Sequence, residues 1–340
     1  MRNTIKMLAC GLSAAATTLP GLAQAEPTIT PLALQAAQDY QLQARFPEWS
    51  QAIELGGMDP VLSDRTAHRQ SRLGPDGAGP RLTVWASDMT ALPGQTVTLH
   101  AQLDRVHTPK PSLLGSTRGA IAAERMTGEV IGEHSGSLGT VVYNDAGTGA
   151  DSVAGDGIYS ASFTLDAAKA PALGYAESLM VSTEAVLDGG DLRRAAGGFV
   201  YSNPAARLTG KVSDRIADGN LVMAIEMEVL APGRIHLAGT LADQLGAPFS
   251  IAQAAGHFEP GIRTLELRFY GLAFHERAIS GPVTLSSLAL TSANGMPNAM
   301  APVVSNLHVS KPVIATQLTA LPFNDAEKLQ AATRALASIK

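Results

Sequence analysis

The chain has 340 residues, a formal net charge of −5 and a single cysteine. This acidic balance argues against nucleic acid as a partner, because phosphate binding requires an excess of Lys and Arg. Glycine (33 residues) and proline (20) are plentiful, whereas charged residues make up only 16%. Such a composition favours a turn-rich all-β protein over a helical one.

The first 25 residues have the features of a cleaved signal peptide. Arg2 and Lys6 form a positive region, residues 7–16 are apolar, and Ala23-Gln24-Ala25 is a cleavage site of the A-x-A form. The apolar run is shorter than the roughly 20 residues that a membrane span requires. We therefore expect a soluble protein without a transmembrane segment, either periplasmic or secreted.

Cys10, the only cysteine, lies inside this leader. Its context, Leu8-Ala9-Cys10-Gly11, leaves a lipoprotein processing site open as an alternative. Cleavage after Ala25 removes two positive charges, which makes the net charge −7, and leaves no cysteine. Disulfides, thiolate zinc sites and cysteine catalysis are then excluded for the mature chain, which must rely on burial of a large core.

Residues 26–80 are expected to form a partly helical N-terminal segment followed by a linker. Thr30-Pro31 is a typical N-cap and first-turn pair, and residues 33–45 are strong helix formers. From residue 63 to residue 80 the chain is polar and rich in Gly, Pro and Arg. We interpret it as a basic linker, with an anionic-ligand patch as the alternative. The basic residues concerned are Arg65, His68, Arg69 and Arg72.

Residues 81–203 are predicted to form an Ig-like β-sandwich. After the turn Leu92-Pro93-Gly94, apolar and polar residues alternate with a period of two, as expected for half-buried strands. The predicted strands are 97–103, 159–165, 179–187 and 199–201.

Asn203-Pro204 marks a predicted boundary, and residues 204–315 are predicted to form a second β-sandwich. Its alternating segments are 221–229, 235–241, 265–270 and 283–290. Short strands separated by turn signals favour sandwiches over a parallel sheet. The predicted fold class is all-β, with two Ig-like or fibronectin-like sandwiches and short helical segments at both ends.

Residues 316–340 are predicted to contain a C-terminal amphipathic helix. Asn324 and Glu327 have the spacing of a capping box, and apolar residues then recur at helical intervals. We expect the helix to dock onto the adjacent domain, with binding of a partner as the alternative. The apolar positions are Leu329, Ala332, Leu336 and Ile339.

One loop, YNDAGTGADSVAGDGIYSA from Tyr143 onward, combines several carboxylates with glycines. Carboxylates held close together repel one another, and Ca²⁺ prefers oxygen-rich irregular loops. The spacing is not that of an EF-hand. The alternative is a long hairpin connection in which Asp side chains bond nearby backbone N–H groups. The candidate calcium ligands are Asn144, Asp145, Asp151 and Asp156.

The end of this loop, Ala154-Gly155-Asp156-Gly157-Ile158-Tyr159-Ser160, resembles a signature of bacterial Ig-like domains in exported proteins. The whole layout, with GKVSDRIADGNLVMAIEMEV and FYGLAFHERAISGPVTLSSLAL in the second sandwich, resembles the exported bacterial family known as domain of unknown function 4785 (DUF4785). The resemblance covers residues 30–315. It implies the fold, and it brings no catalytic residues with it.

No catalytic motif stands out along the chain. There is no Gly-x-Ser-x-Gly elbow, no His-Glu-x-x-His and no phosphate-binding glycine loop. His257 with Glu259, and His275 with Glu276, are the nearest approaches to a zinc pair, and both are expected to be ordinary polar neighbours.

We therefore expect a non-enzymatic exported protein that binds a protein or glycan partner. Two alternatives remain open: a structural spacer of the envelope or of a secretion system, and a hydrolase with dispersed catalytic residues. The partner and the oligomeric state are not encoded in any motif.

Overall fold

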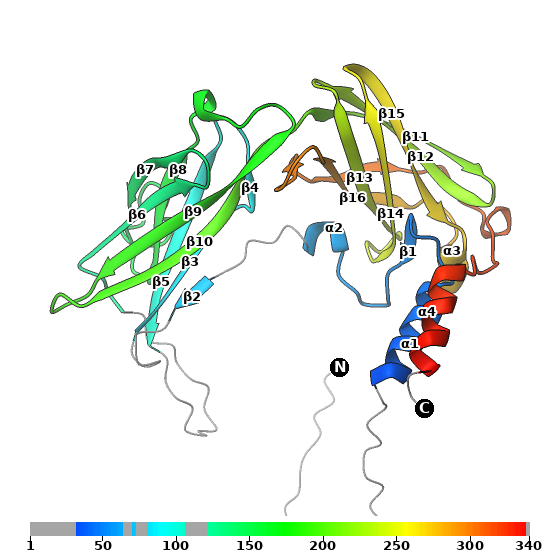
Figure 1. Ribbon diagram of the computed structural model, residues 1–340, viewed down its shortest axis with the longest axis horizontal. Helices are drawn as coiled ribbons and strands as arrows, with labels where there is room; N and C mark the ends of the chain where they lie inside the picture. Colours follow the sequence, from blue (N-terminus) through cyan, green and yellow to red (C-terminus); the bar gives the residue numbers. More distant parts are fainter. Residues whose placement is uncertain (1–31, 64–69, 73–79, 106–120, 338–340) are drawn as a thin grey trace, which may run out of the picture.

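The computed structural model describes residues 32–63, 70–72, 80–105 and 121–337. The predicted signal peptide, most of the basic linker and the last three residues lie outside these ranges. Among the described residues, no helix combines the length and the apolar character that crossing a membrane would require. The chain forms two β-sandwiches, as the sequence predicts, joined into an arch (Figure 1).

The first sandwich packs a five-stranded sheet against a four-stranded sheet. The five-stranded sheet has the order β4 (Thr90–Ala91), β10 (Leu192–Asn203), β9 (Tyr175–Val186), β6 (Arg125–Gly132) and β7 (Gly136–Val142). The four-stranded sheet has the order β2 (Gln70–Arg72), β3 (Pro80–Ala86), β5 (Thr96–Arg105) and β8 (Ile158–Thr164). All pairs are antiparallel except β4 with β10.

Alternation explains the core of this sandwich. In β5, Val97, Leu99, Ala101 and Leu103 are fully buried, and they meet the inward residues of β9 and β10, including Phe199 and Tyr201. Burial of such apolar side chains is the main source of stability for the fold.

The second sandwich packs a six-stranded sheet against a three-stranded sheet. The six-stranded sheet has the order β1 (Ser50–Ala52), β14 (Pro248–Phe258), β13 (Gly233–Ala242), β16 (Thr284–Ser292) and β17 (Ala299–Met300), with β18 (Val304–Val309) also on β16. The three-stranded sheet has the order β11 (Ala206–Ala217), β12 (Asn220–Val229) and β15 (Gly261–Tyr270).

The N-terminal segment belongs physically to the second sandwich, although the first sandwich lies between them in the sequence. β1 pairs with residues 250–252 of β14, and Phe46 is part of the second core. α2 (Pro60–Ser63) follows Asp59, whose carboxylate accepts hydrogen bonds from Thr240 and Ser287 of the sheet. From the sequence alone, residues 26–80 are expected to be a separate segment, because a local pattern does not indicate pairing between strands about 200 residues apart.

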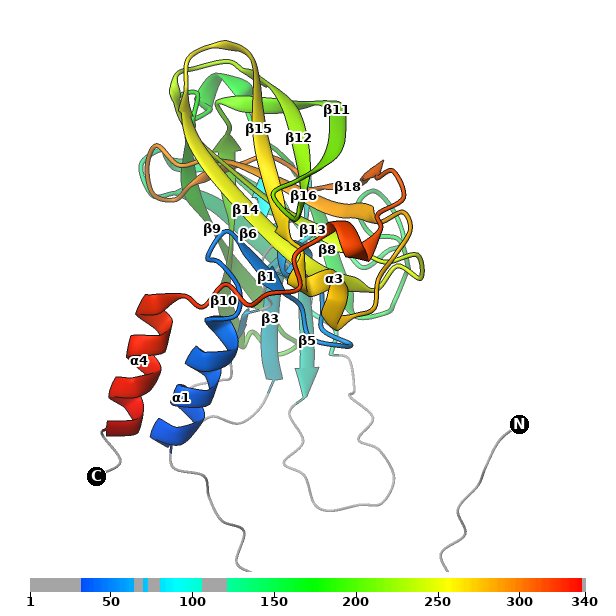
Figure 2. The same ribbon diagram turned by 90° about the vertical axis from the view of Figure 1, so that its right-hand side faces the viewer.

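Two helices form a projecting antiparallel pair (Figure 2). α1 (Leu32–Gln43) packs along α4 (Ala326–Ala337), with Ala37 and Ala332 buried. The predicted capping residue of α4 is wrong by one position: the Asp325 carboxylate, not Asn324, accepts the amides of Glu327 and Lys328, at 3.0 and 3.1 Å. Asn324 instead has a positive φ of 59°. The short helices are α3 (Leu272–Glu276) and the 3-10 turns Ala167–Lys169 and Ala315–Gln317.

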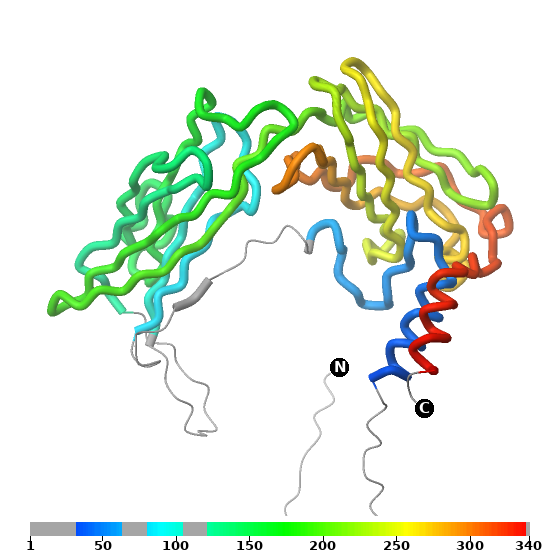
Figure 3. Tube along the Cα trace, in the orientation of Figure 1, coloured from blue at the N-terminus to red at the C-terminus, as the bar shows by residue number. Residues whose placement is uncertain are grey.

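A short elbow joins the two sandwiches, as the trace in Figure 3 shows. β10 ends at Asn203 and β11 begins at Ala206. The loop before β17 reaches back to the first sandwich, where Asn298 bridges Tyr175. The Ser202 hydroxyl also donates to the carbonyl of Met300, at 2.7 Å. Both contacts come from residues 298–300, which connect the second sandwich to the first beside the elbow.

Candidate functional site

The predicted calcium loop connects β7 to β8, which belong to opposite sheets of the first sandwich. The connection is therefore not a hairpin, because the loop crosses from one sheet to the other, but the Asp-to-backbone hydrogen bonds that this alternative predicts are present. Asn144 holds one end by a two-way backbone bridge to Ser160, at 3.1 and 2.9 Å. At the start of the loop the Tyr143 hydroxyl bonds to Thr183, and burial raises the pKa of Tyr143 to about 12.

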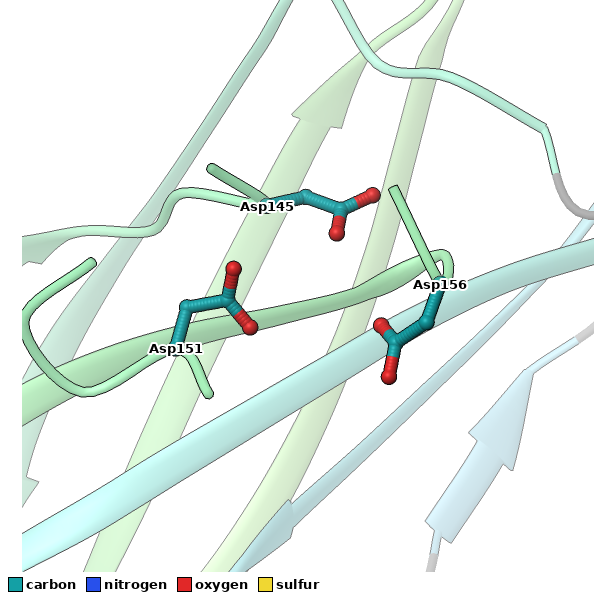
Figure 4. A group of neighbouring side chains, drawn as sticks. All are labelled: Asp145, Asp151 and Asp156. Atoms are coloured by element: carbon teal, nitrogen blue, oxygen red, sulfur yellow. The ribbon is translucent and has the colours of Figure 1, made fainter. Parts of the chain in front are cut away.

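The loop brings three of the four predicted ligands together. Carboxylate oxygens of Asp145, Asp151 and Asp156 lie within 4.8 Å of one another, and Figure 4 shows the side chains converging. Asp151 is buried, Asp145 half-buried and Asp156 exposed. Among the described residues, no other group of three His, Cys, Asp or Glu side chains is gathered in this way.

Backbone amides already compensate part of this negative charge. Asp145 accepts the amides of Gly155 (2.9 Å) and Gly157 (3.1 Å). Asp151 accepts a hydrogen bond from the Gly147 amide (2.5 Å), and Asp156 accepts one from the Ile158 amide (2.8 Å). These three glycines have φ between 67° and 78°, a conformation that other residues adopt only with strain. Glycine is thus what lets the loop turn its amides toward the carboxylates.

The donor set suits a hard cation. Every candidate ligand atom is an oxygen, and Ca²⁺ takes six to eight oxygens in flexible geometry. One oxygen of Asp151 and one of Asp156 accept no hydrogen bond from the described part of the chain. The Asn144 side chain instead accepts the amide of Ala146, at 3.2 Å, as a turn cap. The three aspartates therefore fit a calcium ion, and Asn144 acts through its backbone.

A second feature, which no sequence pattern indicated, is a hollow of about 450 Å³ below α1. We call it the α1 hollow. Its lining residues are Leu42, Gln43, Arg45, Phe46, Gln51, Ala52, Ile53, Glu54, Leu55, Glu276 and Arg277. Residues from α1, β1 and the end of α3 meet here only in the folded chain, so periodicity within one element could not have predicted the hollow.

Most polar groups of the α1 hollow are occupied by structural contacts. Arg45 pairs with Glu276 at 2.5 Å, and Arg277 donates to the carbonyl of Ile53. By contrast, Leu42 and Leu55 at the rim are 59% and 87% exposed. Gln43 and the exposed Glu54 are the polar lining residues without such a contact, so the hollow offers mainly apolar surface.

The other sequence candidates are not brought together with these sites. His275 contacts the carbonyl of Leu318, at 3.2 Å, while its neighbour Glu276 pairs with Arg45. His257 and Glu259 are both exposed at the end of β14. These placements match ordinary structural and surface roles.

Fold and site together define an all-β protein of two sandwiches with a carboxylate-rich crossing loop. The family model for the C-terminal domain of DUF4785 matches residues 205–299. This match confirms the predicted resemblance to DUF4785 for that part of the chain. No protein of curated function matches the chain.

Several solved structures are similar at low identity. A DUF4785 family protein from Legionella pneumophila is 17% identical with a TM-score of 0.44, over 70% of this chain and 57% of that protein. Dimeric latent PorU from Porphyromonas gingivalis is 9% identical (TM-score 0.21) over 87% and 21%. Squid arrestin is 9% identical (TM-score 0.23) over 73% and 98%. The matched part is thus little more than half of the Legionella protein, and none of these scores supports an argument about function.

Proposed function

We propose that this chain is an exported, non-enzymatic binding protein that acts on a protein or glycan partner in the periplasm or outside the cell. The observation that carries the proposal is the α1 hollow, where most polar groups serve the fold and apolar side chains are left at the rim. Exposed apolar surface next to a concavity is typical of interaction sites. Catalysis would instead need polar groups free to act on a substrate.

The binding test compares two matched variants. The immobilised protein is exposed to envelope and culture-supernatant fractions, and bound material is identified. We expect Leu42→Lys with Leu55→Lys to lose the partner, because a charge then faces its apolar surface. Val142→Lys, at a 72% exposed position of the first sandwich, should retain it. Equal capture by both variants would refute the hollow as the site, and no capture by any form would favour the spacer.

Export has its own measurement. The leader of residues 1–25 predicts that the exported protein begins at Glu26. N-terminal sequencing of protein from the periplasmic and supernatant fractions checks this and separates the two locations. Intact Met1 in the recovered protein would contradict the proposal.

We further propose that calcium binds between Asp145, Asp151 and Asp156 and stabilises the first sandwich. A ligand at about 100 times its Kd adds about 2.7 kcal/mol to the free energy of unfolding. Calcium should then raise the melting temperature by roughly 5–10 °C. Asp151→Asn keeps an acceptor for the Gly147 amide but removes the charge, so it should abolish the calcium response. A melting temperature indifferent to calcium and chelator would show that the loop is held by hydrogen bonds alone.

A further inference from the structure

The two sheets of the second sandwich part along one side, between β14 and β15. These strands are joined by the turn at residues 259–260, but they do not pair with each other. Among the residues that the structure describes, β15 pairs with β12 only, and β14 pairs with β13 along its length and with β1 only at residues 250–252. Residues 254–258 of β14 and the facing edge of β15 are therefore open strand edges.

The chain itself fills the other end of this opening with a strand. β1 runs antiparallel to β14, with Gln51 opposite Ile251, and the Gln253 amide donates to the carbonyl of Trp49 at 2.9 Å. On the other side, the Tyr270 amide of β15 donates to the Ser50 hydroxyl, at 3.0 Å. Figure 2 shows β14 and β15 descending from their shared turn toward β1. A strand is thus already accommodated between the two edges.

Beyond Trp49 the same opening continues as an unfilled cleft of about 410 Å³. We call it the β14–β15 cleft. Its lining residues are Trp49, Gln253, Ala254, Ala255, Glu266 and Arg268. The volume falls within the range of ligand clefts in proteins. The chain leaves this path because it turns at Pro47, whose carbonyl accepts the Ser50 amide at 3.1 Å.

Backbone direction shows what this edge of β14 can bind. Successive amides of a strand point to opposite edges, and the Gln253 amide points at Trp49. The amides of Ala255 and His257 therefore point to the same edge, where Ala255 lines the cleft and His257 lies just beyond it. No described residue pairs with this part of the edge. Unpaired strand edges of this kind are templates for another strand.

The side chains around the cleft favour an apolar, uncharged strand. Ala254, Phe258 and Leu265 pack against the second core but stay only half-buried, so an inserted strand would complete their burial. Glu266 is already engaged by Arg215 (2.8 Å) and Arg268 (3.4 Å), which leaves little net charge to neutralise. Ala254 and Ala255 have small side chains, and the Phe258 ring lies over Gly256, so no bulky side chain stands at the edge between Gln253 and His257.

We propose that the β14–β15 cleft binds an extended segment of another protein as an added strand, antiparallel to β14 and continuing the line of β1. The segment accepts hydrogen bonds from the amides of Ala255 and His257 and turns alternate apolar side chains toward Phe258 and Leu265. This is strand addition, in which main-chain bonds supply affinity and alternate pockets supply selectivity. The inference rests on the proposed binding role but uses a surface separate from the α1 hollow.

Position 255 offers a matched pair of variants. The exposed Ala255 has its amide in the cleft rather than in the β13 ladder, so Ala255→Pro removes one donor while the pairing with β13 remains. Ala255→Thr keeps the donor and adds a residue that strands favour. Binding should be lost in the first variant and retained in the second.

The probe is the peptide acetyl-Lys-Thr-Val-Thr-Val-Thr-Val-Lys-amide, added to the full chain while amide hydrogen exchange is followed. At peptide concentrations about ten times the Kd, the amides of Ala255 and His257 should exchange about tenfold more slowly. In the Ala255→Thr variant the peptide should slow amide exchange as much as in the unsubstituted protein. In the Ala255→Pro variant it should not slow exchange of the His257 amide. A peptide methylated at the threonine nitrogens, which face β14 when the valines point inward, should also fail. This peptide control does not depend on how the protein variants fold.

Three results would overturn the proposal. The first is exchange at residues 254–258 unchanged by the peptide, and the second is equal slowing by the methylated peptide. The third is slowing that rises with protein concentration in the absence of peptide, since a second copy would then occupy the edge. Failure of the binding role is distinguishable, because it shows in the capture test with the Leu42 and Leu55 variants and leaves these exchange rates unaffected.

Discussion

Asp59→Ala tests whether the N-terminal segment is an integral part of the second sandwich. The Asp59 carboxylate accepts hydrogen bonds from the Thr240 hydroxyl (2.8 Å), the Ser287 hydroxyl (2.7 Å) and the Val61 amide (2.9 Å). Thr240 and Ser287 are both 0% exposed. Without the carboxylate these two hydroxyls lose their acceptor in a place that water does not reach.

The expected loss follows from these contacts. A buried polar group left unsatisfied costs about 1–3 kcal/mol, and loss of a helix cap costs about 1 kcal/mol. Partial relief comes from rotation of the hydroxyls toward nearby carbonyls. We therefore expect Asp59→Ala to lower the free energy of unfolding of the second sandwich by about 3 kcal/mol. Asp59→Asn, which keeps one acceptor oxygen, should lose about half as much.

Urea unfolding measures this effect, because each sandwich has its own tryptophan. Trp85 lies in β3 of the first sandwich, whereas Trp49 packs against the second core. In a Trp85→Phe background the fluorescence therefore follows the second sandwich. Glu54→Ala, an exposed carboxylate in the same segment, is the control and should change little. If Asp59→Ala unfolds at the same urea concentration as this control, the segment is not anchored as described.

Two further predictions concern single carboxylates. Burial alone would raise the pKa of Glu177, but hydrogen bonds from the Ser135 hydroxyl and from the amides of Ser135 and His134 outweigh it and lower the pKa below its ordinary 4.5. Its stabilising contribution is thus complete above pH 4.5 and is lost as the pH falls through the lower folded value. Glu177→Gln should flatten the acid side of the stability curve in urea titrations between pH 3 and 7, and parallel curves would refute this. Asp325→Ala should remove about 1 kcal/mol of capping from α4 and speed amide exchange at Glu327 and Lys328 about fivefold, whereas an unchanged rate would assign the cap elsewhere.

Sequence patterns predicted those strands whose two faces differ in chemistry. The second half of β12 places Ile225, Met227 and Val229 inside and has a glutamate at each position between them, and a period of two follows directly from its pleat. β14 was not predicted because its second half, from Gln253 to His257, consists mainly of small residues without alternation of apolar and polar side chains. The property that hid this strand is also the one that leaves a cleft beside it.

The candidate sites differ in whether their residues lie close together in the sequence. Asp145, Asp151 and Asp156 are close together in the sequence, since all three lie in one loop whose glycines indicate tight turns. Sequence could therefore name the residues, although not that the Asn144 side chain would accept the Ala146 amide instead of joining the three carboxylates. The α1 hollow and the β14–β15 cleft combine residues about 200 positions apart. Their geometry depends on long-range pairing, about which a single sequence says nothing local.

The discontinuity of the second sandwich constrains the order in which the chain can fold. Residues 44–62 are synthesised before the first sandwich, yet their partners, from Thr240 to Asp325, follow it. Until those strands exist, Phe46, Ile53 and Val61, each less than 8% exposed in the folded chain, have no core to enter. The first sandwich, with its own core, can close as a unit in the meantime. Non-local pairing of this kind is slow because loop closure must precede the contacts that reward it. We therefore expect the second sandwich to form after the first.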